Sequence, residues 1–585
     1  MNIKQKLSLL LILAILYPSG VLAVTRTWDN GGGDGLWGTA TNWSGDALPG
    51  ASDVATFDST TTTNSLFNVT STIDGLSIAS TYTGTITMAT SGLPLLTIGA
   101  SGFSQAGGTF TMNSGVMKVG GVFSQTGSSI LNASGTILLN STSSQTLTPS
   151  SSLPNLIIND GLVGYWKLDD PASLNNSSTT TDSSGYGNTG TATNMGAGSG
   201  PSSTVSSQFK FNNPRSFNFD GTNDRVDVSD TSVFNGSAAT WSAWVNFGSG
   251  ISAQETWLMK GTYSSSWSYA FHSNTDNSIR LFIADSPTDA GNNVGDTAAG
   301  VVSANTWYHL VVVFNGSGVA AADKLKLYIN GANTSMTFSG MNITTLADST
   351  DPLRVGEFTG LGRRLAGLID DVRVYNRALS ATEITDLANG TGPKVASSTI
   401  HTLSSTITID GNFTLAGGLL DASSTGNFGV TVKGDWINYA SSSNFTARNG
   451  TVTLSGTNQS VSGAGTNFNN LTKSVTSADS LTFDFKSTNN VSGTLTLTGT
   501  SGNLLSLRSS SSSGQWKINP LGTRDISFVD VKDSNNINAT EINCSNGCVD
   551  SGNNTNWLFA TAEVLLKYVV KAGNYIFRGG NFIIR

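Results

Sequence analysis

The chain has 585 residues, which is more than one compact core usually holds, and only 12% of them are charged, against about 25% in an ordinary soluble domain. This composition, with 66 glycines, argues against both a charge-expanded disordered chain and a helical bundle. The formal net charge of −8 and the lack of a dense basic run argue against a nucleic-acid partner, because phosphate binding needs clustered Lys and Arg.

Residues 1–23 have the layout of a secretion signal. Lys4 and Lys6 precede an apolar run at 7–16, and small residues at 21–23 suit a cleavage site. The run is shorter than the about 20 residues that a membrane span needs. We therefore expect a secreted, extracellular or cell-surface protein with no membrane span after cleavage. An uncleaved N-terminal anchor is the alternative.

Residues 24–160 consist of short runs of alternating apolar and polar residues separated by Gly, Ser and Asn. This pattern predicts strands with one buried face. The sequence Gly-Phe-Ser-Gln at 102–105 returns twenty residues later as Val-Phe-Ser-Gln at 122–125. A repeat of about 20 to 25 residues is typical of a parallel β-solenoid, or β-helix, in which each coil hydrogen-bonds to the next.

The first residues of this region are rich in aromatic side chains. Trp28, Trp37, Trp43 and Phe57 have no strand periodicity, and we expect them to cap the open first coil. A platform on which carbohydrate stacks is the alternative. The stretch resembles the opening of secreted bacterial β-helix proteins, including autotransporter-like adhesins.

The strand pattern stops near residue 160 and returns at residue 394. Gly-Thr-Ile-Leu-Leu-Asn at 135–140 is echoed by Gly-Thr-Val-Thr-Leu-Ser at 450–455, and each copy is followed by a Gln. The second copy continues directly, whereas the first continues only after 161–393. We therefore expect 161–393 to be a domain inserted into one turn of a solenoid that resumes over 394–559. Three domains in a row are the alternative.

The inserted segment has more aromatic residues and predicts long strands joined by Asn-Gly and Asp-Gly turns. Ser380 and Glu383 form a capping-box pattern that predicts one short helix through Leu387. The motifs include Trp-Ser-Ala-Trp-Val at 241–245 and Ile-Asp-Asp-Val-Arg-Val-Tyr-Asn-Arg-Ala-Leu at 369–379. Their order closely resembles the LamG-like jelly roll of the concanavalin A-like lectin/glucanase group. The resemblance implies a two-sheet sandwich that binds glycans or proteins, often with Ca²⁺, so the whole chain is expected to be all-β.

Catalytic residues are not predicted. Glycoside hydrolysis needs two carboxyl groups about 5 to 10 Å apart, and no two of the five glutamates are near each other in sequence. Adjacent Asp pairs at 169–170 and 370–371 would point to opposite faces of a strand. The histidines are expected to be packed or on the surface, with no role in a Ser-His-Asp triad. The residues tested in this way are Glu255, Glu357, Glu383, Glu541, Glu563, His272, His309 and His401.

Calcium is the only cofactor that the sequence suggests. Ca²⁺ takes six to eight oxygens from carboxylates and carbonyls, and the jelly roll offers several aspartates in loops or at strand ends. The candidate ligands are Asp220, Asp224, Asp370 and Asp371, and Asp182 is a further aspartate that the jelly roll offers. The alternative is that Asp220 and Asp370 cap turns and pair with Arg373 or Arg225.

The last part of the chain contains the only two cysteines, Cys544 and Cys548, which we expect to form a disulfide across an Asn-Gly turn. Trp557 is expected to plug the final coil. The tail at 560–585 could be a short hairpin, a retention signal or a polymer-binding handle.

These features predict an exported, non-catalytic binding or structural protein. The jelly roll would present a carbohydrate- or protein-binding face on a solenoid stalk, as in cell-surface or matrix adhesion. Its partner would be an extracellular glycan or a surface protein. The alternative is an extracellular carbohydrate-active enzyme, a polysaccharide hydrolase or lyase, that uses the jelly roll as its binding module.

Overall fold

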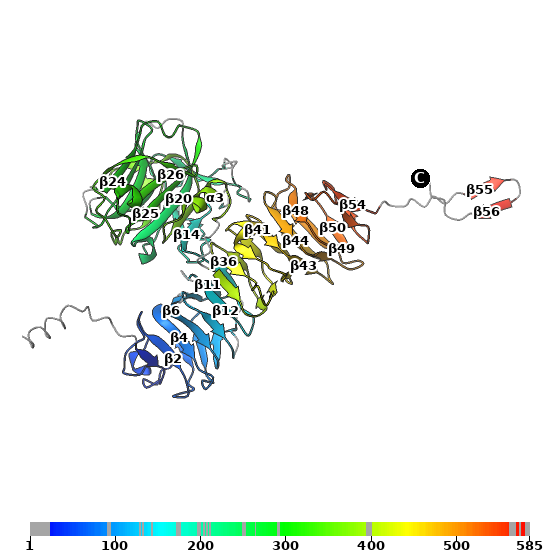
Figure 1. Ribbon diagram of the computed structural model, residues 1–585, viewed down its shortest axis with the longest axis horizontal. Helices are drawn as coiled ribbons and strands as arrows, with labels where there is room; N and C mark the ends of the chain where they lie inside the picture. The colour runs from blue at the N-terminus through cyan, green and yellow to red at the C-terminus, as the bar shows by residue number, and fades with distance from the viewer. Residues whose placement is uncertain are drawn as a thin grey trace, which may run out of the picture.

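The computed structural model describes residues 24–560, apart from 91–94, 128–129, 132–133, 142–143, 171–176, 196–199, 203–204, 206–208, 210–211, 249–252, 264, 289–292 and 394–399, and it also describes 569–572 and 575–578. The predicted signal segment lies outside the described residues. Figure 1 shows a rod of stacked strands with a second domain against its side. No described helix is long and apolar enough to cross a membrane.

The rod is a parallel β-solenoid, as predicted, and each coil contributes a strand to each of three faces. We number the faces in the order in which the chain passes through them from residue 65 onward. Strand β4 (Ser71–Ile78) and strand β6 (Leu95–Gln105) turn from the second face to the third, and their pairing shifts register between Ile73 and Gly75. The predicted repeat is in register, because Phe103, Ser104 and Gln105 pair with Phe123, Ser124 and Gln125.

The strands of the three faces are as follows. The first face contains β3 (Ser65–Phe67), β5 (Thr85–Met88), β7 (Thr109–Thr111), β10 (Ile130–Leu131), β34 (Ile407–Ile409), β37 (Val430–Val432), β40 (Thr451–Leu454), β43 (Asn470–Ser474), β46 (Leu495–Thr498), β49 (Arg524–Ser527), and the closing pair β52 (Ile542–Cys544) and β54 (Trp557–Phe559). The second face contains the first halves of β4 and β6, then β8 (Val116–Val119), β11 (Thr136–Leu139), β13 (Asn155–Ile158), β35 (Phe413–Leu415), β38 (Trp436–Asn438), β41 (Gln459–Gly463), β44 (Asp479–Phe483), β47 (Leu505–Ser509), β50 (Val529–Val531) and β53 (Val549–Asp550). The third face contains β1 (Thr25–Thr27), β2 (Val54–Phe57), the second halves of β4 and β6, then β9 (Phe123–Gln125), β12 (Gln145–Thr148), β33 (Ile400–Leu403), β36 (Leu419–Asp421), β39 (Phe445–Thr446), β42 (Asn467–Phe468), β45 (Thr488–Val491), β48 (Trp516–Pro520) and β51 (Ser534–Asn536).

Alternation along each strand builds the solenoid core. In β37, for example, Val430 and Val432 are buried while Thr431 between them is partly exposed. Residues in register therefore stack along the rod, apolar inside and polar outside. On the first face the outward positions of five successive coils form a row of threonines, which Asp525 follows in the next coil. The row consists of Thr408, Thr431, Thr453, Thr472 and Thr496.

The jelly roll interrupts the solenoid after β13. Strand β12 pairs with β33 (Gln145 with His401), and β13 pairs with β35 (Leu156 with Phe413), so the coils before and after the insertion are direct neighbours. The echo that predicted the insertion is real, but its copies lie on different faces, because β11 belongs to the second face and β40 to the first.

The inserted domain is a sandwich of two antiparallel sheets. The solenoid-side sheet has the order β17 (Gly200–Ser202), β18 (Ser216–Asp220), β32 (Ala366–Tyr375), β20 (Ala238–Phe247), β25 (Trp307–Asn315), β26 (Leu325–Ile329) and β27 (Ala332–Thr334), with β14 (Leu162–Trp166) also paired to β32. The outer sheet has the order β15 (Thr179–Thr180), β16 (Gly190–Thr193), β19 (Arg225–Val228), β29 (Leu353–Val355), β21 (Glu255–Thr262), β22 (Ser266–Ser273), β23 (Ile279–Ile283), β24 (Asn293–Thr297) and β28 (Met336–Ser339). Apolar side chains between the sheets form a core separate from that of the solenoid.

Helices are few and short. Helix α3 (Ala381–Ala388) has the predicted capping box, in which the Ser380 hydroxyl accepts from the Glu383 N–H and a Glu383 carboxylate oxygen accepts from the Ser380 N–H. The other helical elements are α2 (Ala321–Lys324) and the 3₁₀ turns η1 (Ala40–Asn42), η2 (Ser232–Phe234) and η3 (Ser442–Asn444). In the tail, β55 (Val569–Ala572) and β56 (Tyr575–Arg578) pair as a hairpin.

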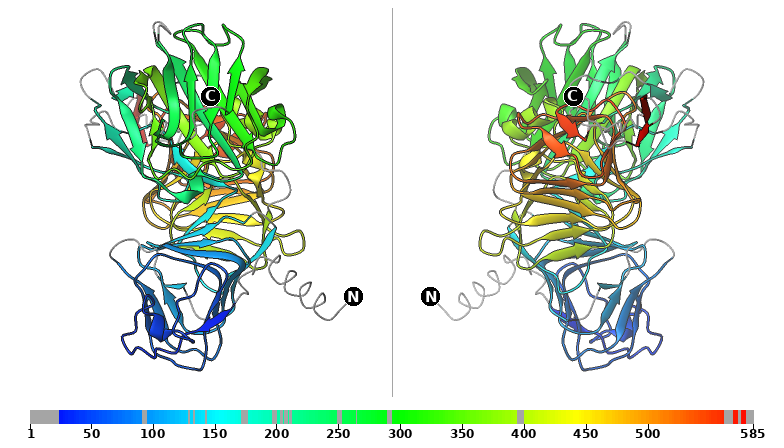
Figure 2. Two further views of the ribbon diagram at one scale, coloured as in Figure 1. Left: turned by 90° about the vertical axis from the view of Figure 1, so that its left-hand side faces the viewer. Right: turned by 90° about the vertical axis from the view of Figure 1, so that its right-hand side faces the viewer.

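The jelly roll contacts both halves of the solenoid at the edge where the second face turns into the third (Figures 1 and 2). In the N-terminal half, the Asn140 amide donates to the Tyr186 hydroxyl (2.9 Å) and Arg377 pairs with Asp160 (2.9 Å). In the C-terminal half, the Tyr439 ring packs edge-on against Tyr165, with centroids 5.2 Å apart.

Both ends of the solenoid are covered. Trp28, Trp37 and Trp43 are at most 1% exposed and pack on one another and on Phe57, so they form the predicted cap, and the alternative of a carbohydrate platform is wrong for them. At the other end Trp557 packs against Trp516, with centroids 6.3 Å apart.

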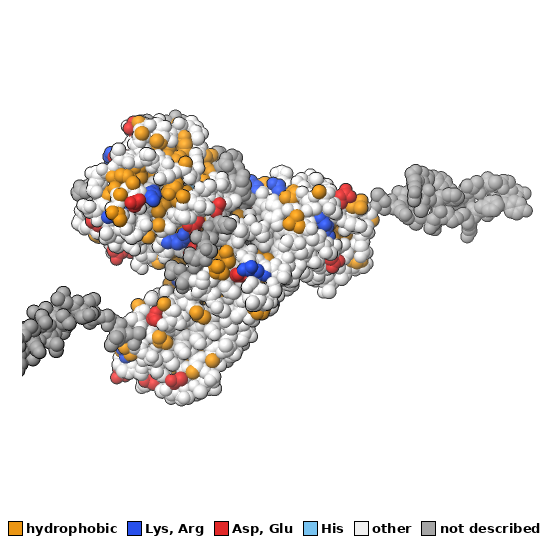
Figure 3. Space-filling model, viewed as in Figure 1, with side chains coloured by type: hydrophobic (Ala, Val, Ile, Leu, Met, Phe, Trp, Pro, Cys, Tyr) orange, Lys and Arg blue, Asp and Glu red, His pale blue; other side chains and the backbone are white. Residues whose placement is uncertain are grey.

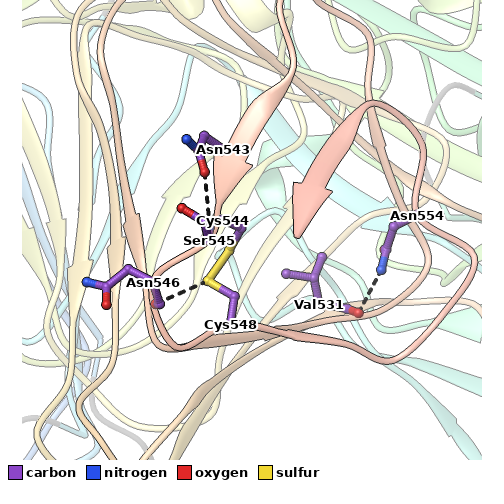
Figure 4. The surroundings of a disulfide bond; sticks show 7 residues. All are labelled: Val531, Asn543, Cys544, Ser545, Asn546, Cys548 and Asn554. Carbon is purple, nitrogen blue, oxygen red and sulfur yellow. Dashed lines mark hydrogen bonds between the residues drawn. A yellow bond between two sulfur atoms is a disulfide. The ribbon is translucent and has the colours of Figure 1, made fainter. Parts of the chain in front are cut away.

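The predicted disulfide joins Cys544 and Cys548 (Figure 4). It closes a turn in which Gly547 has φ 66°, a conformation that glycine adopts readily. The loop lies beside Val531 of the preceding coil, whose carbonyl accepts a hydrogen bond from the Asn554 amide (2.8 Å). The disulfide therefore fixes this turn, while strand pairing holds the last coil to the rest of the solenoid.

Candidate functional site

Two of the predicted calcium ligands lie at the end of β18, with Asp220 as its last residue and Asp224 in the turn that follows. The Asp220 carboxylate accepts from the Thr222 N–H (2.7 Å), and the Asp224 carboxylate accepts from the Asp220 N–H (2.8 Å). Both groups therefore organise their own turn. For Asp220 this matches the alternative expectation that it caps a turn.

The other two predicted ligands, Asp370 and Asp371, are buried in β32. The expectation that their side chains point to opposite faces is wrong, because Asp371 sits in a bulge with φ 51° that breaks the strand alternation. Asp371 pairs with Arg373 (3.2 Å), and the Asp370 carboxyl accepts from the Asn213 amide (2.9 Å). Burial, with the neighbouring charge of Asp371, raises the pKa of Asp370 well above its usual range. The alternative to calcium binding, in which Asp370 pairs with Arg373 or Arg225, is also wrong, because Arg373 pairs with Asp371 and the described partner of Asp370 is Asn213.

The four aspartates thus form two separate groups, and each group already has protein donors. Asp182 is likewise engaged, because it accepts from the N–H groups of Tyr165, Ser184 and Asn188. In the described part of the chain, no three Asp, Glu, His or Cys side chains gather where they could hold a metal ion. The predicted residues do not fit one calcium site, and calcium binding stays a prediction.

The histidines do not form a triad. The Nε2 atom of His309 is 2.8 Å from the Ser242 hydroxyl, but both side chains are buried, and burial lowers the pKa of His309 to about 3. No described partner bonds to Nδ1 of His309, so no carboxylate orients this ring as a catalytic base requires. His401 is buried in the solenoid core, and burial lowers its pKa to about 4.

His272 has a different environment, on the outward side of the outer sheet. Its Nδ1 lies 3.0 Å from the Ser273 carbonyl oxygen, and its Nε2 lies 2.9 Å from a guanidinium nitrogen of Arg363. Burial lowers the pKa of His272 to about 3, so the ring is neutral at physiological pH. The arrangement assigns the ring proton to Nδ1, and Nε2 accepts from Arg363.

Arg363 comes from the small hairpin of β30 (Glu357–Phe358) and β31 (Arg363–Arg364) that folds over the outer sheet. Its guanidinium lies 5.2 Å from the centre of the Phe358 ring. The neighbouring cations are balanced, because Arg364 pairs with Glu357 (3.0 Å) and Arg280 with Asp296 (2.6 Å). None of the ion pairs among the described residues includes Arg363.

We call the group formed by Arg363, His272, Phe358 and the neighbouring Arg280 the Arg363 patch. Its two arginines are partly exposed, whereas His272 and Phe358 are buried and hold the Arg363 guanidinium in place. A guanidinium fixed in this way is suited to binding an anionic group. This patch was not predicted from the sequence. The available signal was the pair Arg363-Arg364 between glycines, but a hairpin with two-residue strands has too little periodicity to be predicted.

Residues 220–385 match the family model described as the concanavalin A-like lectin/glucanases superfamily. The match lies within the inserted domain, whose two sheets form the sandwich described above. The recognition made from motif order is thereby confirmed, and this lectin-like domain has a fold that occurs in both enzymes and binding modules. No curated protein matches the chain.

Several solved structures resemble the chain over 39–40% of its length. They include domain 4 of AbnA, a GH43 extracellular arabinanase from Geobacillus stearothermophilus, in complex with arabinotriose (20% identity, all of that chain covered, TM-score 0.29). They also include the botulinum neurotoxin serotype D ligand-binding domain in complex with N-acetylneuraminic acid (14% identity, TM-score 0.29) and the binding domain of Paraclostridial Mosquitocidal Protein 1 (14% identity, TM-score 0.29). The chain spans about half the length of these last two structures, 52% of each.

Proposed function

We propose that the protein acts outside the cytosol as a binding protein whose lectin-like domain holds an acidic glycan at the Arg363 patch. A carboxylate or sulfate group of the glycan pairs with Arg363, whose guanidinium is held by the buried side chains of His272 and Phe358. The solenoid serves as the stalk. The disulfide supports an oxidising compartment, because such bonds seldom persist in the cytosol.

The observation that carries this proposal is the unbalanced charge of Arg363. Burial lowers the pKa of its guanidinium, with the charge of Arg280 acting in the same direction, so the cation lies in a partly desolvated place without a carboxylate to offset it. An anionic ligand supplies that charge. The neutral His272 ring holds the guanidinium in place and adds no charge of its own.

A glycan array probed with the full chain tests the proposal, comparing uronate-containing, sialylated and sulfated glycans with neutral ones. We expect acidic glycans to bind and Arg363→Ala to weaken that binding by about tenfold or more, as expected for a charge-assisted contact. Arg364→Ala is the matched control, because it removes a neighbouring cation that is already paired. Equal losses in the two variants, or no acidic glycan bound, would contradict the proposal.

A reducing-end assay on the same glycans separates binding from catalysis. Product formation from a bound glycan would favour the alternative, a carbohydrate-active enzyme.

A further inference from the structure

The solenoid has a groove of its own, away from the lectin-like domain. It encloses about 490 Å³ where the third face turns into the first, and it crosses four successive coils. The lectin-like domain contacts a different edge, between the second and third faces. The lining includes Phe445, Phe468, Asn467, Asn490, Ser492 and Leu521.

The groove lies over a tightly packed part of the solenoid core, which makes its floor rigid. Phe445 and Phe468 are 4% and 2% exposed, and both pack against Trp436, with ring centroids 5.1 and 5.3 Å away. Trp436 is itself buried in the core and fixes both rings. Leu521, 60% exposed, adds an apolar wall at one end.

A row of stacked asparagines runs along the groove and beyond it. The Asn490 amide donates to the Asn467 carbonyl oxygen (2.7 Å), the Asn519 amide to Asn490 (3.0 Å), and the Asn538 amide to Asn519 (3.2 Å). A primary amide has two N–H groups and two lone pairs. Each link of the row uses only part of this capacity, so amides remain available to hydroxyl groups at every coil.

The groove has little net charge. Its one cation in the lining, Arg448, is held by Asp421 through two hydrogen bonds of 2.9 and 2.7 Å. The solenoid surface seen in Figure 3 is mostly uncharged. A ligand that matches this surface is neutral and rich in hydroxyl groups, and it has an apolar face that can lie against Leu521.

The regular spacing of the coils along the groove also restricts the shape of the ligand. Successive coils are about 4.7–4.9 Å apart, as in any sheet, so the same amide position recurs at that interval along the rod. A chain that uses these positions together is itself linear and repetitive.

We propose that this groove binds a neutral linear polysaccharide, with the chain lying along the solenoid axis. Ring hydroxyls bond to the asparagine row, and an apolar face of a sugar lies against the exposed side chain of Leu521. This site is independent of the Arg363 patch and takes a different class of glycan.

Calorimetric titration of the full chain with soluble cello-, xylo- and manno-oligosaccharides, from disaccharide to octasaccharide, tests the proposal. We expect affinity to rise with chain length until the oligosaccharide fills the groove, and then to level off. Ser492→Trp fills the groove with an indole and should lower the affinity by about tenfold or more. Ser474→Trp is the matched control, because Ser474 is an exposed serine on the first face outside the groove lining.

Three outcomes would overturn the proposal. They are the absence of binding to any of these oligosaccharides, equal affinity of Ser492→Trp and Ser474→Trp, and loss of binding in Arg363→Ala with binding retained in Ser492→Trp. The last outcome would leave the proposed function standing and reject only the groove. Melting temperatures of the two tryptophan variants serve to check that both are folded.

Discussion

At the scale of single residues, burial and neighbouring groups decide the role of each ionisable side chain. These surroundings were the feature least predictable from the sequence. The sequence shows which ionisable residues are present and that glutamate is rare. The bulge at Asp371 and the hydrogen bond between His272 and Arg363 depend on strand pairing between segments about a hundred residues apart. No local pattern encodes such contacts.

Glu255 offers a test of this point, because it is 3% exposed in β21 and burial raises its pKa to about 7 from a usual 4.5. The unfolded chain loses this proton near pH 4.5 and the folded chain near pH 7, so stability falls as pH rises through this window and stays lower above it. Glu255→Gln has no charge to bury. We expect it to be more stable than the natural chain at pH 8 by about 1–2 kcal/mol, allowing for partial solvation.

Urea unfolding at about pH 8 and pH 4 checks this prediction, because the difference should vanish at the lower pH, where Glu255 is protonated in both states. A stability difference of the same size at both pH values would show that packing, rather than charge, is responsible.

At the scale of elements, the solenoid strands, the insertion, the cap and the disulfide were all predicted, because each depends on local periodicity or on a repeat. Phe103 and Phe123 stack because their coils repeat at the spacing seen in the sequence. The face occupied by each echo copy was not predicted, because one strand-and-turn unit can serve any face. The Arg363 hairpin and the asparagine row were missed, since Asn467 and Asn490 become neighbours only when coils stack.

Reduction of the disulfide should loosen only the end of the solenoid. The bond closes a very short loop, so it contributes about 2 kcal/mol by the loop-entropy relation. Hydrogen–deuterium exchange of the reduced protein should become faster at residues 542–559 and stay unchanged around β37, whose coil has neighbours on both sides. Faster exchange throughout the solenoid would contradict a local role.

At the scale of the whole molecule, the lectin-like domain is docked onto the solenoid by contacts to coils on both sides of the insertion. Tyr439 is central to them, because its ring meets Tyr165 and lies 5.7 Å from the Lys167 ammonium. The architecture was predicted from sequence as a domain within a solenoid. The docking was not, since its residues are scattered from Asn140 to Asp484.

Tyr439→Ala should weaken this docking while leaving both cores intact. The aromatic pair is worth about 0.5–1.5 kcal/mol beyond the area it buries. In scanning calorimetry we expect the transition of the lectin-like domain to fall by about 2–4 °C, with the solenoid transition little changed. Phe428→Ala is the control, because this half-buried ring packs on the solenoid core before β37 and should lower the solenoid transition instead. The opposite pattern would contradict the docking role.

The direct pairing of β12 with β33 and of β13 with β35 also has a mechanical consequence. When the two ends of the molecule are pulled apart, tension passes from coil to coil through these ladders. The inserted domain leaves and re-enters the rod between adjacent coils, so it stands beside the load path. Its outer sheet would then keep its shape while the stalk is under strain, and a ligand held there would not be released by stretching alone.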